Sequence, residues 1–258
     1  MTRPVTIWPL TGIPDITAGD DLAEIIATAL ASARDSLIDG DILVVSSKIA
    51  SKAAGLVVTG DEARDKDSLV RRESEFVVAE RRLSNGRITR VVKALAGPIM
   101  AAAGIDGSNT GGVGDYLLLP HDPDAVCREL HSQLAARFSG DFGVLLTDTS
   151  SRPWRLGVSD FALGASGVRV LEDLRGAPDA DGRVMEVTTR AIADEIASAA
   201  DLVKGKTHGV PVAIVRGLAR FVVGLGRDLD SRDPDGRDPQ SPDPDGHDGA
   251  RGLVRTGR

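Results

Sequence analysis

Two short apolar runs, residues 42–45 and 144–146, predict buried strands, and polar and charged residues follow each of them at once. In architectures that combine helices with a sheet, ligands usually bind where polar groups gather at the carboxyl ends of buried strands. The two runs therefore predict buried strands and, at their carboxyl ends, the place where a site would lie; the alternative interpretation is a capped surface turn.

The remaining elements are predicted from the spacing of apolar residues and from turn residues. Segments with apolar residues every three or four positions predict helices at residues 20–37, 69–80, 122–138 and 189–203. Further short strands are predicted at residues 5–10, 116–119, 184–187 and 210–215. Asn85-Gly86 predicts a tight turn. At 258 residues, the chain is expected to form one large domain or two closely joined ones.

Composition limits the possible functions. Aromatic residues make up 3% of the chain, so the core must be built from Ala, Val, Leu and Ile. The net charge of −7 argues against a nucleic-acid-binding protein, because a surface that neutralises phosphates must be basic. We expect a cytoplasmic protein that does not bind membranes, because there is no charged-then-apolar leader and no apolar run of membrane-spanning length. Residues 226–258 are rich in Asp, Pro, Gly and Arg, which predicts a disordered tail.

Polar residues gather directly after three apolar segments, at residues 46–52, 106–109 and 148–155. Asp106 and Asp148 are carboxylates from distant parts of the chain that can share a divalent cation. An oxygen-only site, with no His or Cys nearby, favours magnesium or manganese over zinc. Lys48 and Lys52 lie beside serines and suit phosphate oxygens. These residues predict a metal-dependent nucleotide enzyme, and the alternative interpretation is a set of capped turns with solvated lysines.

Longer stretches of the chain resemble one known family. They lie in order between residues 8 and 217 and include GDILVVSSK (40–48), AGIDGSN (103–109), LLP (118–120), DPD (122–124), TDT (147–149), RPWR (152–155), ADEIA (193–197) and ADLV (200–203). Together they resemble the single-domain form of coenzyme F420-0:L-glutamate ligase, also called F420-0 gamma-glutamyl ligase. The resemblance implies that residues 1–225 form the ligase domain. It also implies an α+β fold with mixed sheets and packed helices, in two closely joined subdomains, and an intertwined homodimer.

The same resemblance implies a reaction. GTP drives the addition of L-glutamate, through a γ-linkage, to coenzyme F420-0, with F420-1 as a further acceptor. The cofactors implied are Mn²⁺ or Mg²⁺, together with K⁺, and an acyl phosphate is the expected intermediate because a carboxylate is a poor acyl donor. Two other interpretations stay open: a related metal-dependent amide ligase that acts on another acid, and a non-catalytic module that binds a nucleotide or a deazaflavin.

The family's site residues carry over to matching positions of this chain. Asp106 and Asp148 match metal ligands, and Thr149 matches a contact to a second metal. Lys52 and Asp148 are the catalytic residues that we assign on this basis. The positions that match contacts to GTP are Ile13, Pro14, Asp15, Ile16, Ser47, Lys52, Asn109, Lys204, Gly205, Lys206 and Thr207.

Lys206 departs from the family pattern. It stands at about the position where some relatives present an oxygen ligand to the second metal. A cationic lysine cannot ligate a metal, so the sequence leaves open whether this chain has a second metal site. Arg152 and Arg155 are our own assignment, based on their charge, as clamps for the substrate phosphodiester or for glutamate carboxylates.

Overall fold

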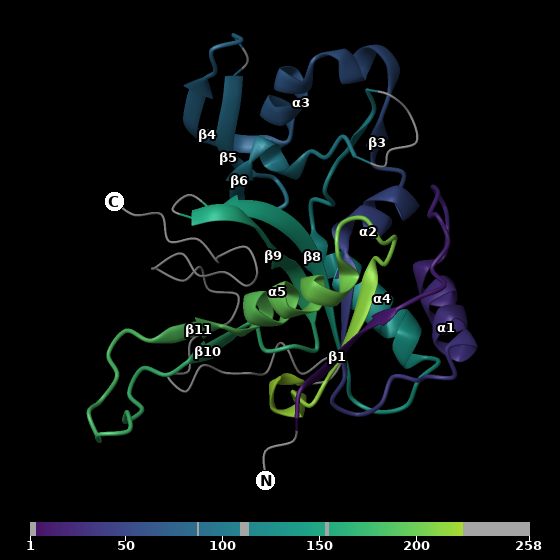
Figure 1. Ribbon diagram of the computed structural model, residues 1–258, viewed down its shortest axis with the longest axis vertical. Helices are drawn as coiled ribbons and strands as arrows, with labels where there is room; N and C mark the ends of the chain where they lie inside the picture. Colours follow the sequence, from purple (N-terminus) through teal and green to yellow (C-terminus); the bar gives the residue numbers. More distant parts are fainter. Residues whose placement is uncertain (1–3, 87, 109–113, 153–154, 224–258) are drawn as a thin grey trace.

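The computed structural model describes residues 4–86, 88–108, 114–152 and 155–223 (Figure 1). The largest sheet in these residues contains, in spatial order, β1 (Thr6–Leu10), β12 (Val212–Arg216), β2 (Ile42–Ser46), β8 (Gly143–Arg152) and β9 (Arg155–Ser166). Strands β2 and β8 pair in parallel, and the other neighbours pair antiparallel. The sheet is therefore mixed.

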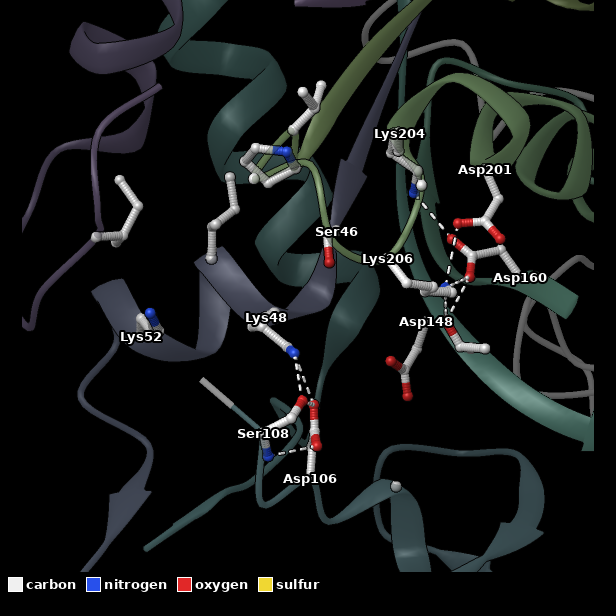
Figure 2. A pocket seen from close by; sticks show the side chains of 18 of the residues that line it. Ser46, Lys48, Lys52, Asp106, Ser108, Asp148, Asp160, Asp201, Lys204 and Lys206 are labelled. Atoms are coloured by element: carbon white, nitrogen blue, oxygen red, sulfur yellow. Dashed lines mark hydrogen bonds and ion pairs between the residues drawn. The ribbon is translucent and has the colours of Figure 1, made fainter. Parts of the chain in front are cut away.

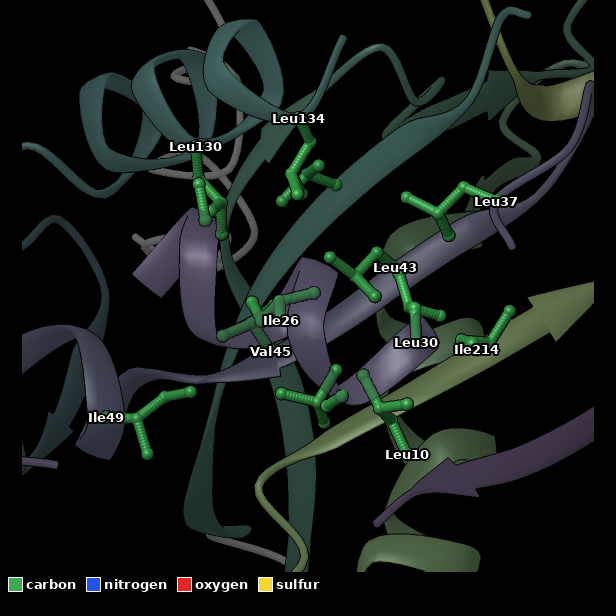
Figure 3. Packing of buried hydrophobic residues seen from close by; sticks show 14 of the residues in the cluster. Leu10, Ile26, Leu30, Leu37, Leu43, Val45, Ile49, Leu130, Leu134 and Ile214 are labelled. Atoms are coloured by element: carbon green, nitrogen blue, oxygen red, sulfur yellow. The ribbon is translucent and has the colours of Figure 1, made fainter. Parts of the chain in front are cut away.

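Helices cover both faces of this sheet (Figure 1). They are α1 (Leu22–Ser32), α2 (Ser47–Ala53), α4 (Pro123–Ala135) and α5 (Ile192–Lys204). In β2, Leu43 and Val45 belong to an apolar cluster with residues of α1, α2 and α4, which Figure 3 shows, whereas Ile42 and Val44 belong to a cluster with residues of α5. Successive side chains of a strand point to opposite faces, so one apolar run serves both helical layers.

Two of the predicted helices begin at an aspartate that caps the helix. Asp21 caps α1 by accepting a hydrogen bond from Glu24 N at 3.0 Å, and Asp122 caps α4 by accepting one from Ala125 N at 3.0 Å. Such caps satisfy backbone donors that have no partner inside the helix. They fix where the helices that flank the sheet begin.

A smaller group of elements lies beside the main sheet (Figure 1). It contains α3 (Lys66–Arg72), the antiparallel pair β3 (Val57–Val58) and β7 (Tyr116–Leu117), and a sheet of β4 (Ser74–Arg82), β5 (Ile88–Ala94) and β6 (Ile99–Ala101). These elements share their own apolar cluster, which includes Val92, Met100 and Leu119. Leu163 of β9 belongs to the same cluster and so joins the group to the main sheet. The α+β class is confirmed.

Two predicted elements are wrong. The helix predicted through residues 69–80 ends at Arg72, because the residues from Ser74 onward form β4, an antiparallel partner of β5. The predicted tight turn is confirmed, since Gly86 N donates to Leu83 O at 3.0 Å. The strand predicted at residues 184–187 is also wrong, because Val184 forms only an isolated bridge with Pro178.

The remaining elements are short. β10 (Leu171–Asp173) pairs with β11 (Thr189–Ala191), and 3₁₀ helices occur at Gly60–Arg64, Ala102–Gly104 and Ala219–Phe221. Across the described segments, no helix combines the length and the apolar character that a membrane span requires. The tail predicted at residues 226–258 lies outside the described residues.

Candidate functional site

The parallel pair β2 and β8 brings the predicted site segments to one edge of the main sheet. β2 ends there and α2 follows at once, which places Lys48 and Lys52 at that edge. β8 does not end after Leu146, as the sequence had suggested, but continues past Asp148 and Thr149, paired with β9. Asp148 and Thr149 therefore belong to a strand whose first half is buried in the core.

A cavity of about 1330 Å³ opens at this edge (Figure 2). Its walls come from the loop before α1, from α2, from the segment that contains Asp106, from β8 and β9, and from the turn after α5. Pockets for one small molecule typically measure about 300–1,000 Å³, so this cavity has room for more than one ligand. The charged residues that line it are Asp15, Lys48, Lys52, Asp106, Asp148, Asp160, Asp201, Lys204 and Lys206.

Asp106 forms a cluster with Lys48 and Ser108 (Figure 2). Lys48 Nζ lies 2.8 Å from Asp106 Oδ2, and Ser108 donates to the same carboxylate from N and from Oγ, each at 2.8 Å. Burial raises the pKa of Asp106, but the hydrogen bonds from Lys48 and Ser108 outweigh burial and hold this pKa below its ordinary value. Asp106 is therefore an anion at neutral pH, and Lys48 neutralises it.

Asp148 has a different environment. Ser47 Oγ donates to Asp148 Oδ1 at 3.2 Å. Burial raises the pKa of Asp148 to about 7, the negative charges of Asp160 and Asp106 add to this effect, and hydrogen bonds from Thr149 N and Ser47 oppose it. A cation bound here would remove the cost of this buried negative charge.

Asp160 organises a third group of charges. Lys204 Nζ lies 2.9 Å from Asp160 Oδ2, and Lys206 Nζ lies 2.9 Å from Asp160 Oδ1. The side chains of Asp160 and Lys204 are only 4% and 3% exposed, so this ion pair is buried. Thr147 and Thr149 also donate to Asp160, at 3.3 Å and 2.6 Å. Although burial raises the pKa of Asp160, Lys204 and the other donors outweigh burial and lower it.

The residues present fit a hard divalent cation that takes part of its coordination from a ligand. In the described parts of the chain, no three His, Cys, Asp or Glu side chains cluster closely enough to hold a metal alone. Asp106 and Asp148, however, both border a recess of about 10 Å³ next to the main cavity. That volume approaches the size needed for a single water molecule. Mg²⁺ is commonly bound by one or two carboxylates plus water and substrate phosphates, and this recess offers the two carboxylates.

Most residues assigned from the sequence lie at the cavity. Those that line it are Ile13, Pro14, Asp15, Ile16, Lys52, Asp106, Asp148, Thr149, Lys204, Gly205, Lys206 and Thr207. Ser47 borders the adjoining recess, and Asn109 lies outside the described residues. Arg152 and Arg155 do not line the cavity. Both are exposed, and Arg152 Nη2 donates to Leu156 O at 3.0 Å, so their substrate role stays a prediction without support from this pocket.

Asp160 and Asp201 also line the cavity, although neither was predicted from the sequence as a site residue. Asp160 is directly opposite Thr149 in the β8–β9 pair, and Asp201 lies on α5 with Oδ1 3.1 Å from Lys206 Nζ. The signal that could have identified Asp160 is the hairpin itself. Once residues 143–166 are recognised as two paired strands, the register of the pair brings Asp160 beside the predicted metal residues.

The fold and the cavity define the class of protein: an α+β protein with a large cavity that charged side chains line. Residues 12–217 match the family described as F420-0:Gamma-glutamyl ligase. This chain belongs to that family. It is similar to the coenzyme F420:L-glutamate ligase of Archaeoglobus fulgidus, with 39% identity over 225 residues that cover 83% of this chain and 88% of the relative.

A second relative gives the same result. The coenzyme F420:L-glutamate ligase of Methanopyrus kandleri is 36% identical over 228 residues, which cover 79% of this chain and 83% of the relative. A third, from Methanothermobacter thermautotrophicus, has the same description and 32% identity over 240 residues. The alignments cover most of both chains, so the comparison extends across the cavity.

Proposed function

We propose that this chain is a GTP-dependent ligase that adds L-glutamate, through a γ-linkage, to coenzyme F420-0, with F420-1 as a further acceptor. Membership of the family supports the proposal, as do relatives described as coenzyme F420:L-glutamate ligases. The observation that carries it is the convergence of Asp106, Asp148, Lys48 and Lys52 on one cavity. Such a combination of carboxylates and lysines suits a metal-bound nucleoside triphosphate.

The reaction has two steps. In the first, a carboxylate oxygen of F420-0 attacks the γ-phosphorus of GTP, the bond to the β,γ-bridging oxygen breaks, and GDP leaves. This converts the carboxylate into an acyl phosphate, which is a far better acyl donor. In the second step, the amine of glutamate attacks the acyl carbon, phosphate leaves, an amide forms, and the nitrogen gives up a proton. A cavity with room for more than one ligand suits such a sequence, because both acceptor and nucleotide must be held together.

The charged side chains of the cavity would have different roles in this reaction. Asp106 and Asp148 would hold Mn²⁺ or Mg²⁺, which when bound neutralises charge on the phosphates. Lys48 would be released from Asp106 when that carboxylate holds a cation, and Lys48 would then be available to phosphate oxygens. The side chain of Lys52 lines the cavity and makes no hydrogen bond or ion pair within the described residues, which suits a group that assists phosphoryl transfer. We also propose that the reaction requires K⁺, as the resemblance to the family implies.

We also propose that the protein is a homodimer. β4 lies at the edge of its three-stranded sheet as the described residues form it. Phe76, Val77 and Val78 of this strand are all exposed. An exposed edge strand with apolar side chains favours pairing with another chain. Light scattering coupled to size-exclusion chromatography tests this proposal. A monomer at micromolar concentration would contradict it.

The test of the activity is a complete reaction with the purified chain. It contains GTP, MnCl₂, KCl, L-glutamate and F420-0, and GDP release and product mass are followed by chromatography and mass spectrometry. We expect a product heavier by one glutamate residue, together with GDP release that depends on F420-0. Asp148→Asn should lower the rates of GDP release and of product formation by about 10²–10³. The matched control Asp181→Asn, at an exposed position away from the cavity, should leave both rates unchanged.

The two alternatives give different results in the same assay. A ligase for another acid releases no GDP with F420-0 but does so with its own acceptor, so a panel of carboxylic acids identifies it. A binding module retains GDP or F420-0 in equilibrium dialysis yet releases no GDP under any condition. Either result would contradict the proposed activity.

A further inference from the structure

The side chain of Lys206 occupies a place that three oxygen atoms define. Its Nζ lies 2.9 Å from Asp160 Oδ1 and 3.1 Å from Asp201 Oδ1, and it also donates to Thr149 Oγ1 (Figure 2). These acceptors come from β9, α5 and β8. An ammonium group has three N–H donors, so the three oxygens satisfy it fully. Two carboxylates and a hydroxyl around one point are also oxygen ligands of the kind that a hard cation takes.

The balance of charges around the Lys206 ammonium differs from the balance at the recess beside Asp106 and Asp148. Around Lys206, two carboxylates, Asp160 and Asp201, face two ammonium groups, because Lys204 pairs with the other oxygen of Asp160. A divalent ion there would add two positive charges to a group whose two carboxylates and two ammonium groups already balance. Around Asp106 and Asp148, Lys48 is the only ammonium among the described residues that pairs with either carboxylate, which leaves an excess of negative charge when both carboxylates are ionised.

We propose that Lys206 is a built-in cation that fills a second metal position, so that each chain binds one divalent ion rather than two. This inference deepens the proposed function and rests on it for the role of the first ion. Lys206 lines the cavity and contacts Thr149, the neighbour of Asp148. Its ammonium therefore lies where a fixed positive charge can stabilise the phosphoryl group during transfer.

The test counts Mn²⁺ bound per chain after equilibrium dialysis of the full chain against MnCl₂ and GDP. We expect one ion for the wild type and two for Lys206→Gln, which removes the charge and offers a carbonyl oxygen in its place. Lys206→Arg is the matched control, because it keeps the charge and should keep the count at one. The side chain of Lys206 is 50% exposed, so these changes leave the core intact. Lys206→Ser serves the same test if the Gln variant unfolds.

Two ions in the wild type, or a count in Lys206→Gln that does not exceed the count in the wild type, would overturn the inference. A second pair of variants separates it from the proposed function. Asp106→Asn should lose the first ion, and adding Lys206→Gln to that variant should restore a count of one through the second position. If the wild type binds no ion, the proposed metal centre at Asp106 and Asp148 is wrong. The role of Lys206 is still decided in that case, by whether Asp106→Asn/Lys206→Gln binds one more ion than Asp106→Asn.

Discussion

Asp160→Asn should strongly destabilise the folded protein, because it leaves the Lys204 ammonium buried without its counter-charge. The pair lies 2.9 Å apart, with both side chains less than 5% exposed, and the remaining described partner of Lys204 Nζ is the Thr147 hydroxyl at 2.8 Å. Removing one member of a buried ion pair costs about 3–5 kcal/mol. For a domain of this size, each kcal/mol shifts Tm by about 2–4 °C, so Tm should fall by about 6–20 °C.

Urea unfolding followed by circular dichroism measures this change, with thermal melts as a second readout. The double variant Asp160→Asn/Lys204→Met removes both charges and should recover most of the loss, because an apolar replacement of a buried pair is often close to neutral. Asp181→Asn is the matched control at an exposed site and should stay within about 0.5 kcal/mol of the wild type. If Asp160→Asn is as stable as the wild type, or if the double variant is no better than the single one, the argument from the buried charge is wrong.

Three further predictions concern the site and its support. Asp148→Asn should lower kcat in the GDP-release assay by about 10²–10³, which is the usual loss when one electrostatic contact to the transition state is removed. Turnover close to that of the wild type would contradict the proposed role of Asp148 in catalysis. Mn²⁺ affinity should fall about tenfold per pH unit below 7, because the pKa of Asp148 is raised to about 7 and the protonated carboxyl cannot ligate the ion. Equilibrium dialysis at pH 6 and pH 8 measures this change. Equal affinities at the two pH values would contradict the prediction. Gly164→Ala should lower the free energy of unfolding by about 1–3 kcal/mol, because the added Cβ would lie 2.4 Å from the Pro123 carbonyl carbon. Urea unfolding measures this change. A variant as stable as the wild type would show that α4 and β9 can move apart freely.

The sequence predicted those parts of the site in which side chains follow directly from an apolar run. Asp148, Lys48 and Lys52 were found because each comes soon after an apolar run, and the parallel pairing of β2 and β8 places such residues at one edge. Asp160 was missed because it lies inside β9. Its position beside Thr149 depends on the register of a hairpin, which the local sequence does not reveal.

The error at residues 74–82 has a different cause. Phe76, Val77 and Val78 are consecutive and exposed, so their apolar character follows no period that could separate a helix from a strand. Their β-branched and aromatic side chains favour a strand, and the turn at Gly86 brings β5 alongside as its partner. The pairing of two strands, rather than the propensity of one, decided the structure here.

The parallel pair at the centre of the main sheet also affects how the protein folds. β2 and β8 are neighbours in space, yet residues 47–142 lie between them, including the whole of α3 and the β4–β5–β6 sheet. Joining strands so distant in sequence closes a long loop before their contacts can form, and folding rates fall as the sequence separation of contacts grows. Chains of this length commonly fold through partly structured intermediates. We therefore expect the inserted elements and the β8–β9 hairpin to form first, and the cavity edge at β2 and β8 to be completed late in folding.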